Sequence, residues 1–85
     1  MRSDDTVAFF EWRNQADENV EKWGLQNEEI LLLAIQEELG ELTQAYLESE
    51  YEEADPSRVP AELSDLGALL IQLRWSLQEG SSDGE

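Results

Sequence analysis

The chain has 85 residues, of which 21 are acidic and 5 are basic, and its formal net charge is −16. This charge repels nucleic-acid phosphates and anionic membrane surfaces, so no nucleic acid or membrane partner is expected. The absence of cysteine and histidine excludes disulfides, zinc fingers, thiol nucleophiles and imidazole bases.

Composition also bears on size and location. The length allows one small domain with a modest core, which favours association with further copies of the chain. The longest apolar run, residues 30–35, is too short to span a bilayer, and the N-terminus lacks the apolar core of a signal peptide, so we expect a cytoplasmic protein. An acidic chain with one lysine, Lys22, is typical of salt-loving organisms (halophiles), although an ordinary acidic protein with a solvated face is the alternative.

The first predicted helix covers about residues 5–22. Ser3 and Asp4 are plausible caps at its start, and Gly24 ends it. Its apolar side chains recur near helical spacing: Val7, Phe10, Ala16, Val20 and Trp23.

The second predicted helix begins near Asn27, a good N-cap, and runs to about Glu50. Two neighbouring stripes on it follow the spacing of a buried face. One stripe consists of Ile35, Leu39, Leu42 and Tyr46, and the other of Leu31, Ala34, Glu38, Glu41 and Ala45. Gly40 inside the helix costs roughly 1 kcal/mol relative to alanine, and either permits close approach of another helix or ligand or is simply tolerated.

A charged stretch, residues 48–55, predicts a frayed helix end and a loop before the third helix. That helix starts within residues 57–60 and ends near Glu79, so residues 1–79 form a single all-α domain and residues 80–85 a disordered acidic tail. Residues 66–73 are apolar on almost every side and need neighbours on every side. Three helices of one chain cannot easily supply them, which favours a homodimer or homotetramer with a four-helix-bundle core.

Two pairs of carboxylates interrupt the apolar helices. Glu38 and Glu41 are three residues apart, as are Glu62 and Asp65, so each pair shares a helix face, and Glu37 lies close enough to join from the edge. Carboxylates in a core are very costly unless a cation is bound, and oxygen ligands without histidine or cysteine suit Mg²⁺, with Mn²⁺ possible. Three other acid pairs with this spacing lie in polar stretches, so the apolar context is the informative part of the pattern.

The segment Glu37-Glu38-Leu39-Gly40-Glu41, followed by Glu62-Leu63-Ser64-Asp65, resembles the MazG-like family of all-α nucleoside triphosphate pyrophosphohydrolases. The family pattern is Glu-Glu-x-x-Glu, a gap of variable length, and then Glu-x-x-Asp. The resemblance covers about residues 23–73. It implies the all-α fold of that family and Mg²⁺-dependent hydrolysis of nucleoside triphosphates to monophosphate and pyrophosphate, in the role of nucleotide pool cleaning.

The resemblance also implies residue roles. The metal ligands would be Glu38, Glu41, Glu62 and Asp65. Glu37 would help to orient the attacking water, and Glu41 or Glu37 would accept its proton. Family members often carry a basic residue or asparagine after the second motif, whereas the only base there in this chain is Arg74, on the opposite side of the helix from Asp65. A degenerate helical module that binds nucleotide or protein without catalysis is therefore the alternative, and so is a purely structural acidic module.

The remaining basic and aromatic residues offer few candidates for binding the phosphates or the nucleobase of a nucleotide. Lys22, Arg13 and Arg58 are the other candidates for phosphate binding. The aromatic residues Phe9, Phe10, Trp12, Trp23 and Trp75 either include a platform for base stacking or pack in the core or a dimer interface. Trp12 is the best candidate for a platform, because its neighbours along the helix are polar.

Overall fold

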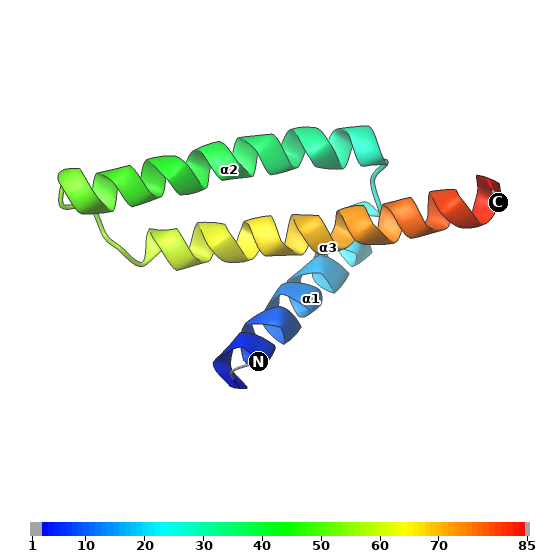
Figure 1. Ribbon diagram of the computed structural model, residues 1–85, viewed down its shortest axis with the longest axis horizontal. Coiled ribbons are helices and arrows are strands. Elements are labelled where there is room, and N and C mark those ends of the chain that lie inside the picture. Colours follow the sequence, from blue (N-terminus) through cyan, green and yellow to red (C-terminus); the bar gives the residue numbers. More distant parts are fainter. Residues whose placement is uncertain (1–2, 85) are drawn as a thin grey trace.

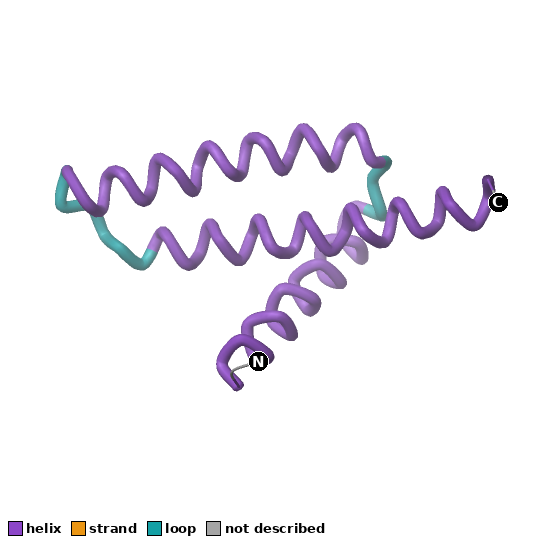
Figure 2. The backbone as a smooth tube through the Cα atoms, in the orientation of Figure 1, coloured by secondary structure: helices purple, strands orange, loops and turns teal. Residues whose placement is uncertain are grey.

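The computed structural model describes the backbone of residues 3–84 and the side chains of residues 4–79. It consists of three helices: α1 (Ser3–Trp23), α2 (Glu28–Tyr51) and α3 (Arg58–Gly84) (Figure 1). Short loops join them, and no strand occurs within residues 3–84 (Figure 2). The prediction of a three-helix, all-α chain is confirmed.

Local signals set the break between α1 and α2. Gly24 adopts a φ of 76°, a conformation that glycine reaches without steric cost, and its N–H donates to the carbonyl of Val20 at 2.8 Å. Asn27 is the N-cap of α2, where its side-chain oxygen accepts a hydrogen bond from the N–H of Ile30 at 2.9 Å. Both boundaries lie within one residue of the predicted ones.

The loop between α2 and α3 is held by polar contacts. Arg58 forms an ion pair with Glu48 at 2.7 Å, which joins the start of α3 to the last turns of α2. The pKa of Glu48 is lowered by hydrogen bonds, first from Gln44 and then from Arg58. These contacts support the reversal that makes α2 and α3 antiparallel (Figure 1).

Helix α3 packs against both other helices. Along most of its length α2 lies beside α3, while α1 crosses α3 at a steep angle (Figure 1). The core between them is small, and its fully buried apolar residues are Ala16, Leu31, Ala45 and Ala68. Gln72 and Ser76 of α3 are buried as well.

The two predicted stripes on α2 differ in how far the chain buries them. Leu31 and Ala45 of the stripe that carries the carboxylates are buried, whereas Leu39 and Tyr46 of the other stripe are about half exposed, at 51% and 50%. Leu70 is also 48% exposed, although residues 66–73 were expected to need neighbours on every side. The chain alone therefore leaves a large part of its apolar surface uncovered.

The end of α3 differs from the predicted end near Glu79, because the helix continues to Gly84. The side chains of residues 80–85, for which a disordered tail is predicted, lie outside the described part, so that prediction stays a prediction. None of the helices within residues 3–84 combines the length and the apolar character that crossing a bilayer requires.

Candidate metal site

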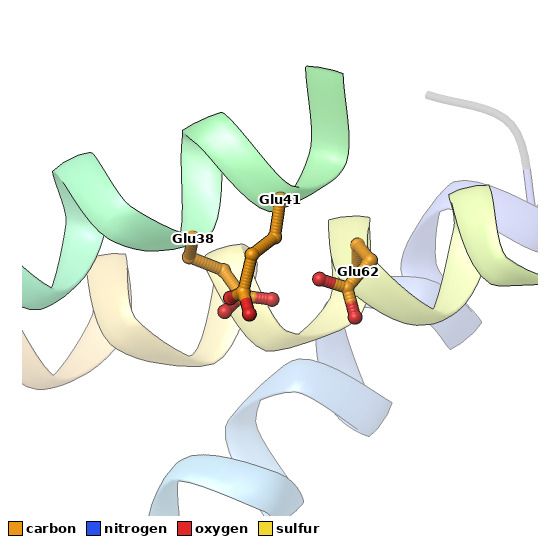
Figure 3. Close-up of side chains that lie close together, drawn as sticks. All are labelled: Glu38, Glu41 and Glu62. Atoms are coloured by element: carbon orange, nitrogen blue, oxygen red, sulfur yellow. The ribbon is translucent and has the colours of Figure 1, made fainter. Parts of the chain in front are cut away.

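Three of the four predicted metal ligands meet in the space between α2 and α3. Glu38 and Glu41 project from one face of α2 toward Glu62, which lies in the second turn of α3 (Figure 3). One oxygen of each carboxylate lies within 4.8 Å of the others. We call these three residues the acidic cluster. The three-residue spacing places Glu38 and Glu41 on one face of α2, and the packing of α3 against that face brings Glu62 to them.

Glu38 is the central member of the acidic cluster. Its side chain is half-buried, and burial is the main reason why its pKa is raised from 4.5 to about 8. The carboxyl groups of Glu41 and Glu62 raise it further, both as partners of the protonated form and by repelling its negative charge. The acidic cluster is therefore a place where a full set of negative charges is unfavourable without a cation.

The oxygen Oε1 of Glu38 is buried, and no donor within the described residues forms a hydrogen bond to it. The groups that act on Glu38 are the carboxyls of Glu41 and Glu62. When these carboxyls are ionised, they can accept hydrogen bonds but cannot donate them. Within the acidic cluster, this oxygen acquires a donor when one carboxyl takes up a proton, and a cation bound there would also satisfy it. A buried acceptor left without a partner costs free energy, so either event would stabilise the site.

Asp65, the fourth predicted ligand, lies one turn after Glu62 on α3 and does not belong to the acidic cluster. Its Oδ1 accepts a hydrogen bond from Nε2 of Gln15 on α1, at 2.5 Å. Gln15 is half-buried and comes from a helix that the motif does not include. Sequence reasoning missed this residue because the bond spans 50 positions and no local pattern marks it.

Glu37 lies on the exposed side of α2, outside the acidic cluster. Its predicted part in orienting a water stays a prediction. Gly40 lies on the same exposed side, and an added Cβ would meet no atom within 4 Å. No close approach to Gly40 therefore occurs within the described part of the chain.

The candidate phosphate-binding residues are found elsewhere on the molecule. Arg58 is paired with Glu48, and the amino group of Lys22 lies 5.5 Å from the centre of the Trp23 ring. Arg13 and Arg74 line hollows between α1 and α3. None of them is among the groups that influence the pKa of Glu38.

The donor atoms of the acidic cluster fit a hard divalent cation. Three carboxylate oxygens with no nitrogen or sulfur ligand are suited to Mg²⁺ or Mn²⁺ rather than to zinc or copper. The buried oxygen of Glu38, which has no donor, is the observation of this structure that points to such an ion. In comparisons with known proteins, no family model, no curated protein and no solved structure matches the chain.

Proposed function

We propose that this protein hydrolyses nucleoside triphosphates to the monophosphate and pyrophosphate, with Mg²⁺ held by the acidic cluster. The observation that carries the proposal is the meeting of Glu38, Glu41 and Glu62, with ligand oxygens within 4.8 Å of one another. The resemblance of the same residues to the MazG-like pattern supplies the reaction. Acids that merely solvate a surface would leave no buried carboxylate oxygen without a donor.

The acidic cluster would hold the ion through Glu38 and Glu62 together with Glu41. Asp65 is the candidate fourth ligand, since its carboxylate has a second oxygen besides the one that accepts from Gln15. A divalent ion bound there would offset the charge of the phosphates and lower the pKa of water. Mn²⁺ is the alternative ion, because it accepts the same oxygen ligands.

The reaction is attack of a water oxygen on the α-phosphorus, with pyrophosphate as the leaving group. We assign the acceptance of the water proton to Glu41, the exposed member of the acidic cluster, and keep Glu37 as the alternative. Gln15 restricts the orientation of the Asp65 carboxylate through its hydrogen bond and so acts as a positioning residue. Such a reaction in the cytoplasm would serve to clean the nucleotide pool.

We further propose that the active form is a homodimer or homotetramer with a four-helix core. The support is the apolar surface that α2 leaves uncovered. Its exposed large side chains are Ile30, Leu32, Leu33, Leu39, Tyr46, Leu47 and Tyr51. Monomeric proteins rarely leave large apolar patches on one element, and a second copy would bury them. Light scattering after size-exclusion chromatography would give the mass directly, and a monomer at all concentrations would refute this part.

The activity is tested by incubating the purified protein with a panel of nucleoside triphosphates and Mg²⁺, at low and high salt. We expect equal amounts of monophosphate and pyrophosphate. Glu38→Ala and Asp65→Ala should abolish turnover while the oligomer persists. Glu29→Ala, which removes an exposed acid from the first turn of α2, is the matched control and should retain activity. If no triphosphate is turned over at any salt concentration, the hydrolase proposal fails.

A second candidate is a degenerate member of the same fold that binds nucleotide or a protein partner without catalysis. The placement of the basic residues favours it: Arg58 pairs with Glu48, Lys22 lies beside Trp23, and none of the described basic residues acts on Glu38. Phosphate binding would then depend almost wholly on the ion. Tight nucleotide binding without turnover would support this candidate over the enzyme.

A further inference from the structure

Two adjoining pockets lie between α1 and α3, lined by residues that the acidic cluster does not include. Each has a volume of about 340 Å³, and they share Phe9, Ile71 and Arg74. Both are shallow and open to solvent, and their volume lies within the range of small-molecule sites. Because both are bounded by the same three residues, we treat them as one site and call it the arginine–aromatic pocket.

The charge of the arginine–aromatic pocket is opposite to that of the whole chain. Arg13 from α1 and Arg74 from α3 line it, and no acidic residue among the described ones does, in a chain with 21 acidic and 5 basic residues. Neither arginine forms an ion pair with another described residue, whereas Arg58 is bound to Glu48. Two free guanidinium groups at one pocket favour an anion that accepts charge-assisted hydrogen bonds from both.

Aromatic rings form the walls of the arginine–aromatic pocket. The ring of Trp12 lies directly over Gly67, where an added Cβ would come within 2.6 Å of its Cε3 atom. Phe9 meets Trp12 edge to face, with ring centres 5.5 Å apart, and remains 46% exposed. Trp75 lines the other end. Trp12 and Trp75 are half-buried, so Phe9 offers the most accessible ring. Such rings beside guanidinium groups favour a flat, unsaturated ligand that stacks on a ring while its anionic group binds the arginines.

We propose that the arginine–aromatic pocket binds a small anion that carries an aromatic ring, without the help of a metal ion. Nucleoside monophosphates and aromatic carboxylates share this chemistry. The strongly acidic surface repels anions elsewhere, so binding is confined to the pocket that both arginines line. Binding at this site uses neither Glu38 nor Mg²⁺ and does not depend on the proposed hydrolase activity.

The test is a calorimetric titration of the full chain in EDTA, with adenosine monophosphate and indole-3-acetate as the two kinds of ring-bearing anion. Adenosine supplies the ring without the anion, and ribose 5-phosphate the anion without the ring. We expect saturable binding of at least one ring-bearing anion. If adenosine monophosphate binds, its affinity should be at least about tenfold higher than that of adenosine or ribose 5-phosphate. The relative affinities of the two anions show whether the pocket prefers a nucleoside monophosphate or an aromatic carboxylate. Absence of saturable binding up to about 10 mM would overturn the proposal.

Variants assign the binding to the pocket. Arg13→Gln and Arg74→Gln should each weaken the affinity for the anion by about tenfold or more. Arg74→Lys should keep only part of the affinity, because lysine lacks the planar guanidinium group that donates two parallel hydrogen bonds. Arg58→Gln makes the same charge change away from the pocket, and its affinity for the anion should stay within about twofold of that of the natural chain.

Two further results would overturn the proposal. Binding that requires Mg²⁺ and is lost in Glu38→Gln rather than in Arg74→Gln would assign the nucleotide to the acidic cluster. A change of oligomer mass in Arg74→Gln, without ligand binding to the natural chain, would show that a second copy covers the pocket.

Discussion

Replacing Glu38 by glutamine tests whether charge is unfavourable in the acidic cluster. Burial, and then the carboxyls of Glu41 and Glu62, raise the pKa of Glu38 in the folded chain from 4.5 to about 8. Between these two values the folded state holds more protons than the unfolded state, so stability is fully present below pH 4.5 and falls as the pH rises through the window. Glutamine has no proton to lose and acquires no charge as the pH rises, so the variant escapes this decline.

The magnitude follows from the size of the pKa shift. A rise of the pKa of Glu38 from 4.5 to about 8 corresponds to a loss of unfolding free energy of at most about 5 kcal/mol, reached at about pH 8. Solvent reaches the half-buried side chain and screens part of this effect, so we expect about 1–3 kcal/mol. The free energy of unfolding of Glu38→Gln should equal that of the natural chain near pH 4.5 and exceed it by this amount near pH 8.

The assay is urea denaturation followed by circular dichroism, at several pH values, in EDTA and at constant protein concentration. Glu37→Gln is the matched control, because it removes the same charge from an exposed position one residue earlier in α2 and measures the general relief of the −16 net charge. If Glu38→Gln gains no more than Glu37→Gln at any pH, the reasoning about the acidic cluster is wrong.

Three further predictions follow from the described contacts. Gly67→Ala should destabilise the chain by about 1–3 kcal/mol in urea denaturation, because the new methyl group overlaps the ring of Trp12. Its control, Gly40→Ala, should stabilise by about 0.5–1 kcal/mol, and a loss instead would show that another copy packs there. Asn27→Ala should lower the free energy of unfolding by about 1 kcal/mol through loss of the cap to Ile30, and an unchanged value would contradict the cap. Mg²⁺ should raise the melting temperature of the natural chain at neutral pH, and an unchanged value would argue against the metal site.

The helix limits could be predicted because their signals are local. Gly24 ends α1 with a positive φ, and Asn27 caps α2 through a bond to the third residue after it. Each of these features lies within a few positions of the helix end that it sets. The third helix runs beyond its predicted end, since the glycine at position 80 does not stop α3.

The candidate site could be predicted in part. The pair Glu38 and Glu41 shares a face by helical spacing alone, and an apolar context marked the face that packs against α3. The pairing of α2 with α3 decided that Glu62 joins them, while Asp65 turns to Gln15 of α1. The spacing of residues within one helix does not specify which side chain of another helix, such as Gln15 of α1, forms a hydrogen bond with a given carboxylate.

By itself, the sequence determined three helices, the break between the first two and the two carboxylate pairs, because all of these depend on neighbours within one or two helical turns. Only the tertiary structure decided that one oxygen of Glu38 is buried without a donor, that Leu39 and Tyr46 of α2 stay half exposed, and that Arg13 and Arg74 line the same hollow. The physical reason is that burial and long-range charge depend on how α1 and α2 cross α3, and the crossing results from packing between residues far apart in the chain.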